Sequence, residues 1–274
     1  MSEKLKLFLE LPKIITRQLR QKYINSKYSN LIPRNPLHDD LYLVAFPKSG
    51  ITWLSVLIAN VNLKVNEVSV KASYYNVRDF IPDIHQTRNL KSNILKFPGF
   101  RIIKSHSAYN PFYIKIIYLI RDPRDVMVSY YNFQKNLGLF HGDLTEFIRT
   151  KSFGISAWIK HVESWFERTN IAQFINFIRY EDLKSNPQKV LERIYKLHGF
   201  NLSKDIYDYA VEASSFREMK KNEEYYLEGN LTVNPNFKFH RKGIAGGYRD
   251  EMSKEDEIFI IRKASKWLKI FRYE

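Results

Sequence analysis

The sequence predicts one α/β domain, with a central parallel β-sheet flanked by helices. First, short apolar or β-branched segments alternate with helical patterns along most of the chain, which is typical of a parallel sheet covered on both faces. Second, 274 residues are enough to bury one full core. Third, an apolar run ends at Pro47, and a Lys-Ser-Gly turn leads from it into a long uncharged stretch.

The expected strands are short runs rich in apolar and β-branched residues. They cover residues 41–46, 100–104, 115–120 and 173–179. The expected helices cover residues 51–63, 123–135, 144–150, 154–167, 187–197 and 204–213. A last helix begins near Ser253, where Ser-Lys-Glu-Asp resembles a capping box, and runs through Trp267.

The two ends of the folded region are set by composition. We expect residues 1–40 to form an N-terminal helical extension and a linker, and residues 41–274 to form the domain. Four charged residues interrupt the apolar stretch 5–19, which excludes a signal-peptide core. The stretch 222–240 is polar, aromatic and without a period, which is typical of a lid or a binding loop.

The charge indicates an anionic partner. Lys and Arg total 44 against 29 Asp and Glu, for a formal charge of +15. A nucleotide, a nucleic acid, a glycan and a membrane surface all fit such an excess. The lack of cysteine excludes disulfides, thiolate catalysis, zinc ribbons and iron–sulfur ligation, and it fits a cytoplasmic location. No window of about 18 apolar residues predicts a transmembrane helix.

The loop after the first expected strand predicts a phosphate site. A strand, a short loop and a helix N-terminus gather backbone N–H groups and a favourable dipole around one point. Lys48 and Thr52 add a positive charge and a hydroxyl. The loop is P-loop-like only, because Lys48 precedes Gly50, whereas the lysine of nucleotide triphosphatases follows the last glycine. A plain strand-to-helix turn is the alternative.

A lysine and a histidine follow the second expected strand. Lys104 and His106 point to the same side because side chains alternate along a strand. They lie at its carboxyl end, the edge where open α/β sheets bind ligands. The lysine is expected to lower the pKa of His106, so that the neutral imidazole can act as a base. A structural histidine is the alternative, and the histidines at 38, 85, 141, 161, 198 and 240 lack a comparable setting.

Two further segments carry cations. The third expected strand ends at Arg121, and Asp122-Pro123 starts a helix in which Ser129 lies two turns along. Arg121 and Ser129 together could hold a second phosphate, or Arg121 could form an ion pair with a nearby acid. The acids Asp122 and Asp125 are favoured at a helix start by the dipole alone, and they form no metal-binding cluster.

The last segment combines cations with glycines. Arg241 and Lys242 are followed by Gly243 and two further glycines, a pattern that suits phosphate but also a solvated basic turn. Two alternative functions remain open at this point: a nucleotide kinase-like phosphoryl transferase, and a non-catalytic protein that binds nucleic acid or glycan.

Taken in order, the motifs resemble those of the soluble sulfotransferases that use 3′-phosphoadenosine-5′-phosphosulfate (PAPS). The matching segments are Phe-Pro-Lys-Ser-Gly-Ile-Thr-Trp at 46–53, Lys-Ser-His at 104–106, Tyr-Leu-Ile-Arg-Asp at 118–122, Tyr-Glu-Asp-Leu at 180–183, Ser-Phe-Arg-Glu-Met at 215–219 and Arg-Lys-Gly at 241–243. The resemblance covers most of the chain, and it implies in-line transfer of a sulfuryl group to a hydroxyl or amine, with adenosine 3′,5′-bisphosphate (PAP) as the product and no metal.

The resemblance also implies a role for each matching residue. The 5′-phosphosulfate end and one side of the adenine are expected at Lys48, Ser49, Gly50, Thr52 and Trp53. The 3′-phosphate is expected at Arg121, Ser129, Arg241, Lys242 and Gly243. The adenine and ribose are expected at Tyr180, Ser214 or Ser215, Phe216 and Met219. His106 matches the catalytic base, Lys48 stabilises the bridging oxygen, and Lys104 steadies the transferred group.

Some positions depart from the family pattern. Ile51 replaces a hydroxyl residue, and Gly246-Gly247-Tyr248-Arg249 replaces Gly-Asp-Trp-Lys. The dimer motif of the animal cytosolic members is degenerate, which leaves dimerisation open. The expected partner is a small-molecule hydroxyl acceptor (a phenol, alcohol, lipid or sugar) and not a nucleic acid. Candidate residues for its pocket are Phe80, Ile81, Phe133, Phe140, Phe153 and Tyr226.

Overall fold

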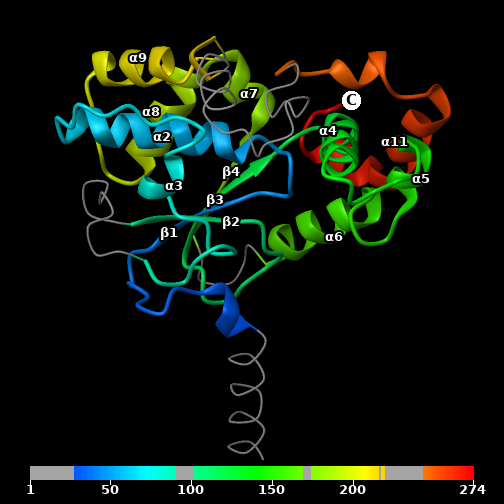
Figure 1. Cartoon of the computed structure of the whole chain (residues 1–274), viewed down its shortest axis with the longest axis horizontal. Helices are drawn as coiled ribbons and strands as arrows, with labels where there is room; N and C mark the ends of the chain where they lie inside the picture. Colours follow the sequence, from blue (N-terminus) through cyan, green and yellow to red (C-terminus); the bar gives the residue numbers. More distant parts are fainter. Residues whose placement is uncertain (1–27, 91–100, 169–173, 216, 220–242) are drawn as a thin grey trace, which may run out of the picture.

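A four-stranded sheet forms the centre of the protein (Figure 1). The computed structural model describes residues 28–90, 101–168, 174–215, 217–219 and 243–274. The strands are β1 (Leu41–Val44), β2 (Ile102–Ser105), β3 (Lys115–Ile120) and β4 (Phe174–Arg179). The expected strands are confirmed, except that positions 100 and 173 lie outside the described residues.

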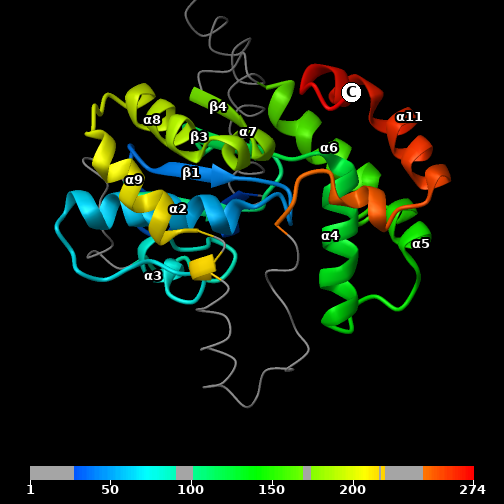
Figure 2. The ribbon, with the colours of Figure 1, turned by 90° about the horizontal axis from the view of Figure 1, so that it is seen from above.

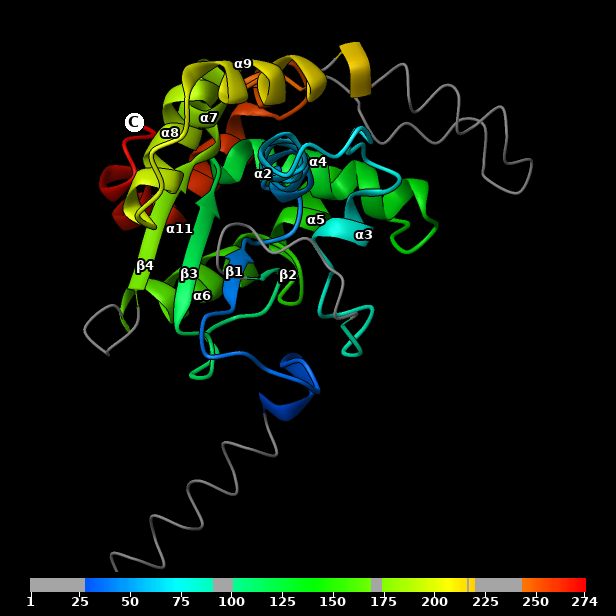
Figure 3. The same cartoon turned by 90° about the vertical axis from the view of Figure 1, so that its left-hand side faces the viewer.

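All strand pairs are parallel, in the order β2-β1-β3-β4. Leu41 is paired with Ile102 on one side and with Lys115 on the other. The chain leaves β1 toward one edge of the sheet and β3 toward the other, so the strand order reverses between them. Open α/β sheets bind ligands at such a reversal, beyond the carboxyl ends of the strands. Figure 3 shows the strands side by side, with α2 and α4 beyond their arrowheads.

Helices cover both faces of the sheet, as Figures 1 and 2 show. One face carries α2 (Ile51–Val65), α7 (Tyr180–Ser185), α8 (Pro187–Leu197) and α9 (Lys204–Ala213). The other carries α4 (Pro123–Asn136), α5 (Leu144–Arg149), α6 (Ile155–Phe166) and α11 (Lys254–Ile270). Leu41 and Leu43 of β1 belong to the first core, and Tyr42 and Val44 to the second, because alternate residues of a strand face opposite ways.

Side-chain caps set where α4 and α11 begin. The Asp122 carboxylate accepts the backbone N–H of Arg124 at 2.9 Å, with Pro123 in the first turn. The Ser253 hydroxyl accepts the backbone N–H of Asp256 at 3.1 Å, which confirms the expected start of the last helix. That helix continues past Trp267 to Ile270.

Four short elements were not expected from the sequence. They are α3 (Val77–Phe80), α7 and the 3₁₀ helices η1 (Ser29–Leu31) and η2 (Gly247–Asp250). None of them is long enough to show a helical period, and α7 follows β4 without a turn residue between them. The N-terminal extension up to residue 27 and the expected lid at 222–240 lie outside the described residues.

Candidate active site

A cavity of about 470 Å³ lies at the carboxyl edge of the sheet. Each strand contributes the residue or loop that follows it: Lys48 after β1, His106 after β2, Arg121 after β3 and Tyr180 after β4. Residues that are far apart in the sequence therefore meet at one place, as the parallel topology requires. The cations predicted from the first three motifs share this cavity.

The backbone of the loop between β1 and α2 leaves helix N–H groups without a side-chain cap within the described part of the chain. Lys48 and Gly50 have positive φ angles of 67° and 93°, and no side chain of the described residues caps α2 at Gly50. The first backbone N–H groups of α2 are thus left to a ligand. The buried Ser49 hydroxyl also lacks a hydrogen-bond partner among the described residues. Lys48, Gly50 and Thr52 line the cavity, whereas Ser49 is not part of the described wall.

Gly50 is needed because of Tyr180. A Cβ atom at Gly50 would lie 2.6 Å from Cδ2 of the Tyr180 ring. Cation–π contact places the Arg121 guanidinium 4.4 Å from the centre of the same ring. The ring therefore packs between the phosphate loop and the cation that follows β3.

The imidazole of His106 is held in one tautomer. Its Nδ1 lies 2.8 Å from the carbonyl oxygen of Ala45, and because a carbonyl only accepts, Nδ1 carries the proton. The lone pair is then on Nε2. Burial, followed by the charge of Lys104, lowers the pKa of His106 to about 4. The side chain lines the cavity as a neutral base.

Two other histidines support His106, although the sequence assigned them no role. The backbone N–H of His106 donates to Nε2 of His85 at 3.0 Å. His161 Nε2 lies 3.2 Å from the carbonyl oxygen of His106, and its Nδ1 lies 2.7 Å from the Tyr118 hydroxyl. The carbonyl fixes the proton on Nε2, so Nδ1 accepts from Tyr118. Burial lowers the pKa of His161 to about 3, which keeps this ring neutral as well.

Lys104 forms an ion pair with Asp83. Its Nζ lies 3.1 Å from Oδ2, and both side chains are largely buried. Burial alone would raise the pKa of the Asp83 carboxyl, but Lys104 and the N–H of His85 together lower it. The carboxylate thus stays charged and holds the Lys104 ammonium beside His106. Asp83 was not predicted, since only an isolated bridge joins it to Lys104.

Arg121 connects three parts of the site. Its guanidinium donates to the carbonyl oxygen of Lys48 at 3.2 Å and to that of Ile244 at 3.4 Å. It also lies 3.6 Å from the carboxylate of Asp125, which is the ion pair given above as the alternative to phosphate binding, and Arg121 lines the cavity. Its buried Nε lacks a partner among the described residues. Ser129 and Gly243 also line the cavity.

The expected adenine side is partly assembled. Trp53, Tyr180 and Met219 line the cavity, and the indole N–H of Trp53 donates to the carbonyl oxygen of Ser214 at 2.9 Å. The Ser214 hydroxyl is buried and accepts from Asn60 at 3.0 Å. The Ser215 hydroxyl accepts the backbone N–H of Glu218 at 3.3 Å. Neither hydroxyl is part of the described cavity wall, and Phe216, Arg241 and Lys242 lie outside the described residues.

The remaining wall is mostly apolar and aromatic. Of the candidate acceptor residues, Ile81 and Phe133 line the cavity, together with Val77 and Tyr130. The Lys48 ammonium lies 4.2 Å from the centre of the Phe133 ring, so the two expected subsites are adjacent. Phe80, Phe140 and Phe153 are not part of the described wall, and Tyr226 lies outside the described residues.

The described residues contain neither a cluster of metal-binding side chains nor a membrane-spanning helix. In that part of the chain, no three His, Asp or Glu side chains lie close enough together to hold a metal ion. The helices described there include none that is both long and apolar enough to cross a membrane.

Relatives of known function cover most of this chain. Sulfotransferase 1B1 of the dog (Canis lupus familiaris) is 28% identical over 233 residues, which make up 77% of this chain and 77% of that protein. Sulfotransferase 1 family member D1 of the mouse (Mus musculus) is 29% identical over 265 residues, or 86% of this chain and 87% of that protein.

Solved structures share the fold. Mouse sulfotransferase SULT7A1 complexed with PAP has a TM-score of 0.62 at 24% identity, over 89% of this chain and 88% of that one. Retinol dehydratase in complex with androsterone and PAP has a TM-score of 0.65 at 22% identity, over 90% of this chain and 84% of that one. The model of the sulfotransferase domain matches residues 38–270. With the six motifs and this match in agreement, the chain belongs to the sulfotransferase-domain family.

Proposed function

We propose that this protein transfers the sulfuryl group of PAPS to a hydroxyl group of a small molecule, with His106 as the general base. The observation that carries the proposal is the Nδ1–H of His106, which donates to Ala45 and so leaves the Nε2 lone pair for the acceptor. His106 lines the same cavity as Lys48 and the first turn of α2. Membership in the sulfotransferase family supports the reaction type.

The residues of the cavity suit the nucleotide. The uncapped N-terminus of α2, with Lys48 and Thr52 in the cavity wall, fits the 5′-phosphosulfate end, whereas Ser49, which is not part of the described wall, remains a prediction there. The unpartnered Nε of Arg121, in a cavity that Ser129 and Gly243 also line, fits the 3′-phosphate. Trp53, Tyr180 and Met219 offer ring faces and a thioether for the base. Phe216, Arg241 and Lys242 remain predictions at this site.

Each reactive step has a residue in place. When bound, PAPS supplies an activated sulfuryl group. His106 accepts the acceptor's hydroxyl proton at Nε2, while its bond to Ala45 fixes the ring plane. Lys48 offers positive charge to the bridging oxygen, and Lys104, held by Asp83, offers it to the sulfuryl oxygens. These positioned charges meet the main needs of an in-line transfer, which are alignment and a neutralised leaving group.

The acceptor is a small, largely apolar alcohol or phenol in this proposal. The wall formed by Val77, Ile81, Tyr130 and Phe133 leaves apolar surface beside His106. The fold neighbour retinol dehydratase was solved with androsterone. A lipid alcohol fits the same wall, and a sugar fits it less well. The cytoplasmic location of the protein remains a prediction.

A direct assay tests the proposal. The purified protein is incubated with labelled PAPS and a panel of phenols, alcohols, amines and sugars, and separately with ATP and magnesium. We expect His106→Ala to lower turnover by about 10²–10⁴-fold and to leave PAP affinity unchanged. His141→Ala, at an exposed position outside the cavity wall, serves as the control. Full activity of His106→Ala would refute the base, and magnesium-dependent use of ATP alone would favour the kinase-like alternative.

A further inference from the structure

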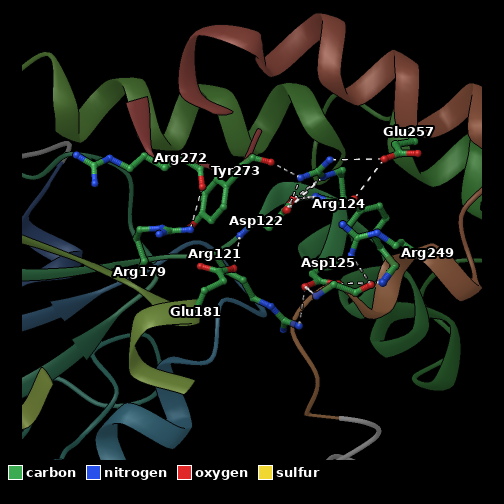
Figure 4. A network of polar contacts seen from close by, with 12 residues as sticks. Arg121, Asp122, Arg124, Asp125, Arg179, Glu181, Arg249, Glu257, Arg272 and Tyr273 are labelled. Atoms are coloured by element: carbon green, nitrogen blue, oxygen red, sulfur yellow. Dashed lines mark hydrogen bonds and ion pairs between the residues drawn. The ribbon is translucent and has the colours of Figure 1, made fainter. Parts of the chain in front are cut away.

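Asp125 holds a segment of the cavity wall through its backbone. The carboxylate accepts the N–H of Gly246 at 2.7 Å through Oδ2 and the N–H of Tyr248 at 3.0 Å through Oδ1. Only 3% of its side chain is exposed. Residues 243–248, named here the 243–248 segment, are thereby bound to the first turn of α4. Figure 4 shows Asp125 turned toward this segment.

Arg121 completes the connection. Its guanidinium lies 3.6 Å from Oδ2 of Asp125 and donates to the carbonyl oxygen of Ile244 at 3.4 Å. It also donates to the carbonyl oxygen of Lys48 in the phosphate loop, at 3.2 Å. The carboxylate therefore orients both the segment and the cation that faces the expected 3′-phosphate.

The segment needs such an anchor. Gly243 and Gly246 have positive φ angles of 59° and 79°. Glycine adopts this conformation easily, but fixing it costs more conformational entropy than fixing any other residue. At the far end, the buried Tyr248 donates from its hydroxyl to Glu257 at 3.2 Å and lies 4.6 Å below the Arg124 guanidinium. At the near end, Ile244 is 57% exposed, and the segment is held by Asp125 of α4 and by Arg121, which precedes that helix.

A role as a helix cap does not account for Asp125. The cap of α4 is Asp122, whose carboxylate accepts the N–H of Arg124. Both oxygens of Asp125 are instead used on backbone N–H groups more than a hundred residues away, at sequence separations of 121 and 123. A carboxylate beside a phosphate site repels the ligand, so its presence there calls for an offsetting benefit.

We propose that Asp125 is a positioning residue that fixes the 243–248 segment and Arg121 before the nucleotide binds, and so sets the preference for a nucleotide with a 3′-phosphate. This inference rests on the proposed function. An anchored segment loses less entropy on binding than a free one, and the gain falls on the phosphate that the segment contacts.

The test compares PAP with adenosine 5′-monophosphate, which lacks the 3′-phosphate. By calorimetry, we expect Asp125→Asn to weaken PAP binding by about 10- to 100-fold, the effect of losing a hydrogen bond to a charged group. Binding of the monophosphate should change by less than about threefold, and Asp125→Glu should restore part of the PAP affinity. The inference would be overturned if Asp125→Asn left the ratio of the two affinities unchanged, as it would if both fell equally. A gain in PAP affinity would also overturn it.

Asp256→Asn is the matched control. Asp256 is equally buried, with 3% of its side chain exposed. Its carboxylate lies 2.6 Å from the Arg149 guanidinium, and neither residue is part of the described cavity wall. This variant should lower stability and keep the ratio of the two affinities.

Hydrogen exchange of the wild-type protein is a second test, which needs no variant. The amides of Gly246 and Tyr248 should be protected without nucleotide, and exchange at open-loop rates would refute the anchor. If the wild type bound neither nucleotide, the proposed function would fail, whereas the exchange result would still decide whether the anchor exists.

Discussion

Replacing Gly50 by alanine should damage the phosphate loop in a way that can be calculated from two terms. Gly50 has a φ of 93°, and an alanine in this region costs about 1–2 kcal/mol. The new Cβ would also lie 2.6 Å from the Tyr180 ring, well inside van der Waals contact. Overpacking of this kind costs about 1–3 kcal/mol. We therefore expect the free energy of unfolding to fall by about 2–5 kcal/mol.

Gly138 provides a control for the first term. It has a φ of 68°, and nothing lies within 4 Å of the Cβ that an alanine would add there. Gly138→Ala should therefore show only the backbone cost of about 1–2 kcal/mol. The difference between the two variants isolates the contact with Tyr180.

The assay is chemical denaturation, combined with calorimetry of PAP binding. Because Tyr180 also contacts Arg121, displacement of its ring should weaken PAP binding in Gly50→Ala and leave it unchanged in Gly138→Ala. Equal losses of stability in the two variants would show that the Tyr180 contact is not the reason for glycine at position 50.

Two further predictions follow from the histidines. Burial lowers the pKa of both His106 and His161 in the folded state, to about 4 and about 3, below the ordinary value of 6.5. The stability that the two neutral rings contribute is present above pH 6.5 and is lost as the pH falls through these folded-state values. The free energy of unfolding should therefore decline on acidification, and His161→Phe should reduce that decline. The charge of Lys104 also lowers the pKa of His106, so Lys104→Met should raise that pKa toward its ordinary value and should lower turnover. NMR titration and the rate assay measure the two effects, and an unchanged pKa of His106 would contradict the assigned cause.

The sequence was enough to predict the centre of the site. Lys48, His106 and Arg121 each follow a strand that is recognisable from its apolar run, and parallel strands bring such positions to one edge. Strand character and chain order alone therefore bring these two cations and the base together, without knowledge of any side-chain contact.

The supporting residues could not be predicted in the same way. His161 contacts the carbonyl oxygen of His106 across 55 residues of sequence, from a helix whose apolar pattern only shows that it is packed. Asp83 joins Lys104 through an isolated bridge next to a four-residue helix. Such contacts depend on how loops fold back over the sheet, and no local period records this. For the same reason Ser214, expected at the adenine, has its hydroxyl bonded to Asn60 in the core.

The start of α4 shows why the residues with no local signal still matter for the site. Arg124 pairs with Asp122 at 2.7 Å and donates to the carbonyl oxygen of Tyr273 at 2.6 Å (Figure 4), and none of these three residues is part of the described cavity wall. The backbone N–H of Asp122 donates to the Glu181 carboxylate at 3.0 Å. This turn is thus fixed to the C-terminal residues and to α7 before any ligand arrives. Because these contacts fix the turn that follows Arg121, the contacts that Arg121 makes at the cavity decide where its guanidinium lies. A pre-arranged anion site requires a cation that is positioned in this way.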